Sequence, residues 1–281
     1  MSPESQASEA LPSRRRRTPR GGRHRGAESY LLPPGSPVLI LAAPGPAGAP
    51  GGDIARELAR LVELEQTGQP ALVGHLEGAD LHLGGVLAGL RPQREDEPAA
   101  VVVPLTTGPD PDVEAAVRKI VADAPVRAVA TEALGPHPLI AEALHERLAE
   151  AGLARADRVR MMTMVTAASG VVVVTPGDHE AVRQAEVTSV LLAARLAAPV
   201  FTAAIGDEAG IASAAGQLRA SGASRLAVAP HLIGPEISPE RLHAAALAAG
   251  AEHSAPIGAH PALAQVAALR YVEALANALA D

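Results

Sequence analysis

From Pro37 onward, short runs of branched aliphatic residues alternate with longer segments whose apolar residues recur at helical spacing. Each short run ends in Gly, Pro or polar residues, which is typical of a buried strand leading into a loop. The pattern predicts strands at 38–45, 70–77, 99–105, 126–134, 171–177 and 199–206, and one within 225–240 that His231 closes. It predicts helices at 53–68, 81–91, 113–124, 138–153, 179–197, 211–222 and 240–249, and a last helix that opens after 254–261.

The second half of this series repeats the first. LGPHPLIAEAL at 134–144 parallels IGAHPALAQVA at 257–267, and VVVPLTTGPDPD at 101–112 parallels AVAPHLIGPEISPE at 227–240. A repeat far longer than a solenoid period indicates two similar domains. We therefore expect an α/β protein with an internal duplication.

Each domain should contain a mostly parallel four-stranded sheet flanked by helices, because apolar strands alternating with helices are buried on both faces. We expect a leader at 1–37, a first domain at 38–155 and a second at 156–281. Ligands of open parallel sheets bind beyond the carboxyl ends of the strands. The strand-end loops are therefore where a site is expected.

Composition narrows the class of protein. Among 281 residues there are no cysteines, which excludes disulfides, thiolate metal sites and cysteine nucleophiles. No apolar run is long enough to span a bilayer, and nothing near Met1 resembles a signal peptide. We expect a cytoplasmic protein without membrane contact.

Charge is distributed unevenly. The leader at 1–37 holds seven arginines against three glutamates, whereas the whole chain carries a net charge of −7. The leader is rich in Ser, Pro and Gly and lacks an apolar period, so it is expected to be disordered. No aromatic or foldable module accompanies the arginines, and we therefore favour a solvated tail over a nucleic-acid contact.

The sequences of the strand-end loops do not indicate a nucleotide-binding motif or a serine hydrolase site. The loop at 43–53 is rich in Gly and precedes a helix, yet it has neither the dinucleotide fingerprint nor the Lys-Ser/Thr ending of a P-loop. The segment SGVVVVTPG at 169–177 has no Gly-x-Ser-x-Gly elbow, so a serine hydrolase is not indicated.

Three residues at strand ends are the candidate ligands. In HLE at 75–77, His75 and Glu77 lie on the same face of a strand, where imidazole and carboxylate could bind a divalent ion or exchange a proton. His231 closes the corresponding third strand of the second half and is a further metal candidate. An exposed, non-functional role remains the alternative for all three. The repeated His137 and His260, each followed by proline, are expected to cap helices.

The duplicated layout, the Leu-Glu at 76–77, the VVVPL strand and the LGPHPLIAEAL and GAHPALAQVAALRYVEAL segments resemble the CbiX-like sirohydrochlorin chelatases. The resemblance covers roughly 38–278 and implies insertion of Co²⁺ or Fe²⁺ into a tetrapyrrole in cobalamin or siroheme synthesis. It carries the family's second-strand glutamate to Glu77. It also shows a departure: Pro44 and Pro176 stand where the family has its first-strand histidine, and Pro239 stands near the third-strand position.

Three functions remain open from the sequence. The chain could be a metal chelatase whose catalytic pair is His75 and Glu77, with His75, Glu77 and His231 binding the metal. It could be a non-catalytic binding or regulatory protein for a tetrapyrrole or another small molecule. It could also be an interaction protein that uses its basic leader.

Overall fold

The computed structural model describes residues 32–91, 97–155, 167–234 and 236–278. Its first half contains β1 (Val38–Pro46), α1 (Pro50–Leu61), the π-helical turn η1 (Val62–Thr67), β2 (Ala71–Glu77), α2 (Leu83–Ala88), β3 (Ala100–Pro104), α3 (Pro111–Ala122), β4 (Ala128–Ala130) and α4 (Pro138–Glu150). Its second half contains β5 (Gly170–Thr175), α5 (His179–Leu196), β6 (Val200–Ala204), α6 (Glu208–Ala220), β7 (Leu226–Pro230), α7 (Pro239–Ala249), β8 (Glu252–His253) and α8 (Pro261–Ala278).

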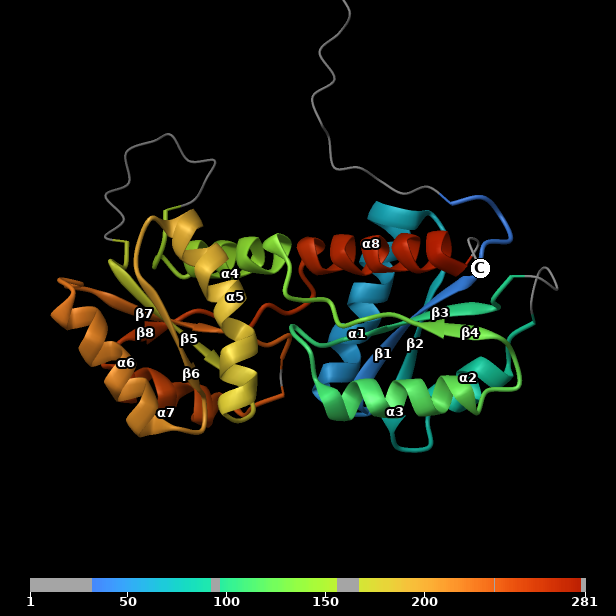
Figure 1. The fold of residues 1–281 in the computed structure, drawn as a ribbon, viewed down its shortest axis with the longest axis horizontal. Coiled ribbons are helices and arrows are strands. Elements are labelled where there is room, and N and C mark those ends of the chain that lie inside the picture. The colour runs from blue at the N-terminus through green and yellow to red at the C-terminus, as the bar shows by residue number, and fades with distance from the viewer. Residues whose placement is uncertain (1–31, 92–96, 156–166, 235, 279–281) are drawn as a thin grey trace, which may run out of the picture.

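The strands form two four-stranded sheets with the same topology. The order is β2-β1-β3-β4 in the first sheet and β6-β5-β7-β8 in the second, and every pairing is parallel. The central strands β1, β3, β5 and β7 are almost entirely buried because helices cover both faces of each sheet (Figure 1). The predicted duplicated α/β architecture is confirmed.

Some predicted boundaries differ from the structure. The strand expected over 126–134 is paired only at Ala128–Ala130, since β4 is an edge strand that bonds to β3 alone. Its counterpart β8 has only two residues and was not predicted. The helix expected over 53–68 is divided between α1 and η1, and it ends where Gly68 adopts a left-handed conformation with φ 66°.

The last helix of each half packs on the other half. Helix α4 contacts β7 and α5 of the second half, whereas α8 contacts β3, β4 and α1 of the first half (Figure 1). On α8, the Tyr271 side chain is fully buried, and its hydroxyl donates a hydrogen bond of 2.6 Å to the carbonyl of Pro37, at the start of β1. One hydrophobic core therefore includes residues of both sheets and both exchanged helices.

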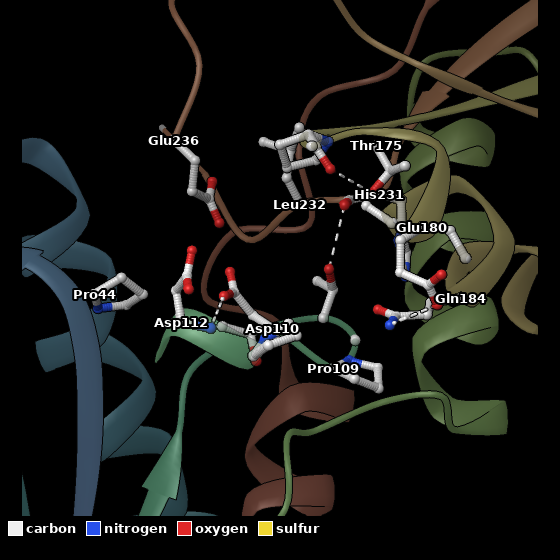
Figure 2. Close-up of a pocket in the computed structure, with 18 of the residues that line it drawn as sticks. Pro44, Pro109, Asp110, Asp112, Thr175, Glu180, Gln184, His231, Leu232 and Glu236 are labelled. Carbon is white, nitrogen blue, oxygen red and sulfur yellow. Dashed lines mark hydrogen bonds between the residues drawn. The ribbon is translucent and has the colours of Figure 1, made fainter. Parts of the chain in front are cut away.

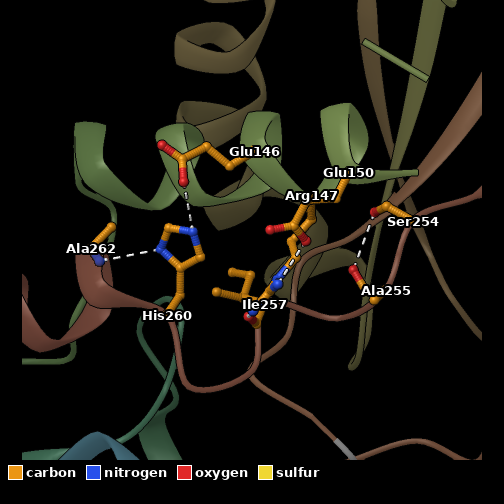
Figure 3. Close-up of polar contacts among 8 residues, drawn as sticks. All are labelled: Glu146, Arg147, Glu150, Ser254, Ala255, Ile257, His260 and Ala262. Carbon is orange, nitrogen blue, oxygen red and sulfur yellow. Dashed lines mark hydrogen bonds and ion pairs between the residues drawn. The ribbon is translucent and has the colours of Figure 1, made fainter. Parts of the chain in front are cut away.

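Polar contacts join the exchanged helices to the segments that lead into them. Arg147 on α4 donates from Nε and Nη2 to the carbonyl of Ile257, at 2.8 and 2.6 Å (Figure 3). His260 accepts the backbone N–H of Ala262 on Nδ1 and lies 3.1 Å from Glu146 of α4 through Nε2. In the other direction, Arg270 on α8 donates to the carbonyl of Ala133, just before α4, at 3.0 Å.

The repeated histidines cap helices, as the sequence predicts. His137 accepts the N–H of Leu139 at the start of α4, and His260 accepts that of Ala262 at the start of α8. Each ring thereby satisfies a backbone donor that the first helical turn leaves free. Burial lowers the pKa of both histidines, more than the neighbouring Glu146 raises that of His260, which keeps the imidazoles neutral as acceptors.

The segment boundaries at 37 and 155 remain predictions. Residues 1–31 of the expected leader lie outside the described residues, and Leu32 donates a backbone hydrogen bond to Thr67. Within the described ranges, no helix combines the length and apolar character that a membrane crossing requires.

Candidate functional site

A cavity of about 750 Å³ lies between the two sheets at the carboxyl ends of their central strands. This is the edge at which open parallel sheets bind ligands. The loop after β3, the start of α5 after β5 and the loop after β7 form most of its wall (Figure 2). The residues that supply its polar groups are Thr106, Thr107, Asp110, Asp112, Thr175, Asp178, Glu180, Gln184, His231 and Glu236.

Helix starts place carboxylates in this wall. Asp110 accepts the N–H groups of Asp112 and Val113 at the start of α3, at 3.2 and 3.1 Å. Asp178 does the same for α5, accepting from Glu180 and Ala181. These are ordinary N-cap interactions, which stabilise a helix by about 1 kcal/mol each. Two of the cavity's carboxylates are therefore fixed in position by the local fold.

The loops after β3 and β7 touch across the cavity. Thr107 donates from Oγ1 to the backbone carbonyl of His231 at 3.2 Å. The His231 ring lies beside Gly108 of the same β3 loop, with its Cε1 3.9 Å from where a Cβ on that glycine would stand. The two halves of the chain thus meet at His231.

His231 is the most unusual side chain of the site. It is 2% exposed, and neither ring nitrogen has a hydrogen-bond partner. Burial lowers its pKa to about 4, so the imidazole is neutral at physiological pH. A buried, unpaired polar group costs about 1–3 kcal/mol. One ring nitrogen of a neutral imidazole carries a lone pair, which can bind a metal ion or take a proton from a bound ligand.

Glu236 belongs to the loop that follows β7. Its carboxylate accepts the N–H of Ile233 at 3.0 Å and that of Gly234. Burial of the carboxyl group raises its pKa, and these backbone hydrogen bonds oppose the rise. Figure 2 shows the carboxyl groups of Asp110, Asp112 and Glu236 directed toward one another across the cavity.

His75 lies against the end of β1 and does not line the main cavity. The side chain is fully buried, and Nδ1 lies 2.7 Å from the carbonyl of Gly45, which can only accept. Nδ1 therefore carries the proton, and Nε2, which has no partner, keeps its lone pair. Gly45 also lines a smaller, mostly apolar cavity of about 150 Å³, which shares Pro44 and Glu236 with the main cavity.

The predicted ligand set is only partly assembled. Glu77 is exposed at the end of β2, whereas His75, two residues before it, is buried. Among the described side chains that line the main cavity, only His231 of the three predicted ligands is present. Within the described ranges, no group of three or more His, Asp or Glu side chains is placed to hold a metal ion.

Two of the three prolines that stand where the resemblance places histidines line the site. Pro44 and Pro176 both line the main cavity, and Pro239 begins α7 after the N-cap residue Ser238. Asp178, Glu180 and Gln184 were not singled out from the sequence. The sequence feature that could have indicated them is the TPGDHE loop at the end of a strand, but its residues are not spaced like a known set of metal or ligand-binding residues.

Comparison with known proteins identifies relatives of this architecture. Residues 47–151 match the CbiX family model. A search of curated proteins gives no significant match. The solved structure of CbiX, the terminal enzyme of siroheme biosynthesis in denitrifying bacteria, is 19% identical and superimposes with a TM-score of 0.56. The alignment covers 85% of this chain and 99% of that one.

Other solved structures are more distant. An extracellular ligand-binding receptor from Verminephrobacter eiseniae is 15% identical, with a TM-score of 0.31 over 76% of this chain and 61% of the receptor. This similarity is too low to bear on the site. The CbiX match, in contrast, has the same duplicated fold over nearly its full length.

Proposed function

We propose that this chain is a CbiX-like protein that acts on a tetrapyrrole and a divalent metal ion, because residues 47–151 match the CbiX family model and the fold is that of a CbiX structure. The reaction is insertion of Co²⁺ or Fe²⁺ into the macrocycle, as in the sirohydrochlorin chelatases. The metal is a substrate of this reaction and not a resident cofactor. The site is the cavity between the two sheets.

The observation that carries this proposal is the neutral, unpartnered imidazole of His231 in the cavity wall. Metal insertion replaces both pyrrole N–H protons of the macrocycle by one divalent ion, so two protons must leave. A neutral imidazole can accept one such proton or bind the incoming ion. The carboxylates of Asp110 and Asp112 raise the local concentration of a divalent cation.

His75 and Glu77 remain the alternative ligand pair. The proton on Nδ1 of His75 is held by the Gly45 carbonyl, which orients the ring and leaves Nε2 free, as in many metal-binding histidines. Glu77 lies at the strand-end position that the family resemblance assigns to its glutamate. Both assignments, His231 and the pair His75 and Glu77, can be tested, and we favour His231.

The test is a metal-insertion assay followed by absorbance. Purified protein is mixed with sirohydrochlorin and Co²⁺ or Fe²⁺, and the rate is compared with the spontaneous reaction. His231→Ala should lower the catalysed rate about 100-fold or more, the usual effect of removing a general base. The control His243→Ala, which alters an exposed histidine on α7, should retain the rate.

The outcomes separate the candidates. Loss of rate in His75→Ala and Glu77→Ala, with His231→Ala unchanged, would assign the chemistry to the other pair. No rate above the spontaneous reaction, with sirohydrochlorin or with a macrocycle that bears uncharged arms, would reject the chelatase function.

A second candidate function is binding of a tetrapyrrole without turnover. Pro44 and Pro176 favour it, because they occupy cavity positions where the family resemblance places a histidine, and proline can neither bind a metal nor carry a proton. A shift of the tetrapyrrole spectrum on adding protein without metal, combined with no insertion activity, would support this function.

A further inference from the structure

The charge of the main cavity is one-sided. Five carboxylates line it, from Asp110, Asp112, Asp178, Glu180 and Glu236. Among the described residues in its wall there is no lysine or arginine. The tetrapyrroles of this pathway carry many carboxylates on their arms, and a cavity for such arms would require clustered cations.

Most of these carboxylates have no cationic partner among the described residues of the wall. Asp110 and Asp178 bond only backbone N–H groups of the helix turns that they cap. Only Glu180 is paired with a cation, since it contacts Arg183 within α5. The cavity thus presents several negative charges that no neighbouring cation neutralises among the described lining residues.

The helix starts at the cavity have their first-turn backbone donors already occupied. Helix starts are the usual protein sites for carboxylates and phosphates. Here the first-turn N–H groups of α3 and α5 are occupied by Asp110 and Asp178, and those of Ile233 and Gly234 by Glu236. A carboxylate arm at these helix starts would therefore meet negative charge, because their N–H groups already bind the protein's own carboxylates.

A separate observation shows that the cavity is built for a ligand. The His231 side chain is 98% buried in the wall with both ring nitrogens unpartnered, although a leucine would fill such a place without an unpaired polar group. The cavity volume of about 750 Å³ is far larger than a single ion needs and falls in the range of organic-ligand pockets.

From this arrangement we infer that the cavity selects a macrocycle whose arms are uncharged or cationic, such as one with amide in place of carboxylate arms. The identity of the ligand as a tetrapyrrole rests on the proposed function. The charge selection does not, because it follows from the carboxylates, the occupied backbone donors and the unpartnered imidazole.

The test uses two synthetic porphyrins of similar size and opposite charge. These are tetrakis(N-methyl-4-pyridyl)porphyrin, which is cationic, and tetrakis(4-carboxyphenyl)porphyrin, which is anionic. Binding to the full chain is followed by porphyrin fluorescence at low and at physiological ionic strength. We expect the cationic probe to bind at least about tenfold more tightly at low salt, with the difference shrinking as salt is added.

Variants distinguish the cavity from the acidic surface as a whole. The triple variant Asp110→Asn, Asp112→Asn, Asp178→Asn removes three cavity charges, and asparagine preserves both N-caps. It should weaken the cationic probe roughly 10- to 30-fold, at a few-fold for each charge. The matched control Asp207→Asn, Glu208→Gln alters the N-cap and first turn of α6, outside the cavity, and should leave binding within about twofold.

The probe and variant measurements can each contradict the inferred charge selection. Equal or tighter binding of the anionic probe, or equal loss in the triple variant and its control, would overturn it. Failure of the proposed function is a different result: neither sirohydrochlorin nor a macrocycle with uncharged arms would show metal insertion, while the cationic probe still binds in the cavity. If insertion occurs, the inference also predicts a lower KM for an amidated macrocycle than for its carboxylate form.

Discussion

The hydroxyl of Thr107 donates to the backbone carbonyl of His231 at 3.2 Å and so joins the strand-end loops of the two sheets. The two residues are 124 positions apart in the chain. The bond holds the histidine's backbone against the β3 loop, while the ring remains without a polar partner.

Replacement of Thr107 by valine should destabilise the protein. Thr107→Val preserves the shape of the side chain but leaves the His231 carbonyl without this donor, which should cost about 1 kcal/mol. Urea unfolding followed by circular dichroism measures the change. The neighbouring Thr106 provides the control, because its buried hydroxyl has no partner. Thr106→Val should be neutral or slightly stabilising, and equal losses in both variants would contradict the role of the Thr107 bond.

His231 should make the protein less stable at acidic pH. Its pKa of about 4 in the folded chain lies below the ordinary value of 6.5, so the unfolded chain binds the proton more readily. Its contribution is therefore fully present above about pH 6.5 and is lost as the pH falls toward 4. Linkage gives a loss of about 2 kcal/mol at pH 5.

His231→Leu isolates this contribution from that of other histidines. The variant should be as stable as the parent at pH 7, or about 1 kcal/mol more stable, because two unpaired polar atoms are removed. Its free energy of unfolding should fall less than that of the parent between pH 7 and pH 5. An identical decline in both proteins would show that His231 does not titrate as the structure implies.

Arg147 should be important for holding the exchanged helices. Arg147→Met retains the aliphatic stem but removes both hydrogen bonds to the Ile257 carbonyl, at an expected cost of about 2 kcal/mol in the free energy of unfolding. Arg183→Met is a suitable comparison, since Arg183 pairs only with Glu180 on the exposed side of α5. That change should stay within about 0.5 kcal/mol. Similar losses in both would indicate a general effect of removing surface arginines.

The capping role of His137 predicts rescue by asparagine. His137→Ala removes the acceptor for the Leu139 N–H and should cost about 1 kcal/mol in unfolding experiments. His137→Asn supplies a new acceptor at the same N-cap and should recover most of that loss. If asparagine were as damaging as alanine, ring packing and not the hydrogen bond would explain the effect.

The two sheets could be predicted from the sequence, but the packing of α4 and α8 on the opposite halves could not. Apolar runs such as VVVPL and their repeat predict buried parallel strands whose loops gather at one edge, and the structure has them there. Helical periodicity shows that α4 and α8 each have a face to bury. It cannot show on which sheet, because the two sheets offer chemically similar aliphatic surfaces.

The candidate site was predicted in location more than in composition. Alternation predicts that His75 and Glu77 share one face of β2, yet it cannot show that His75 is buried against the end of β1 while Glu77 is exposed. His231 was identified from its position after a strand. Its isolation from polar partners depends on how the β3 and β7 loops meet, which one sequence does not reveal.

The crossing of α4 and α8 also limits how the cavity can change shape. A two-domain protein that closes like a hinge needs an interface it can open at little cost. Here each half contributes a helix to the interior of the other, so swinging the halves apart would pull Tyr271 and its neighbours out of a packed core. The mouth of the cavity therefore has a nearly fixed aperture. A ligand should therefore enter through local displacement of the strand-end loops and not through a hinge motion of the two halves.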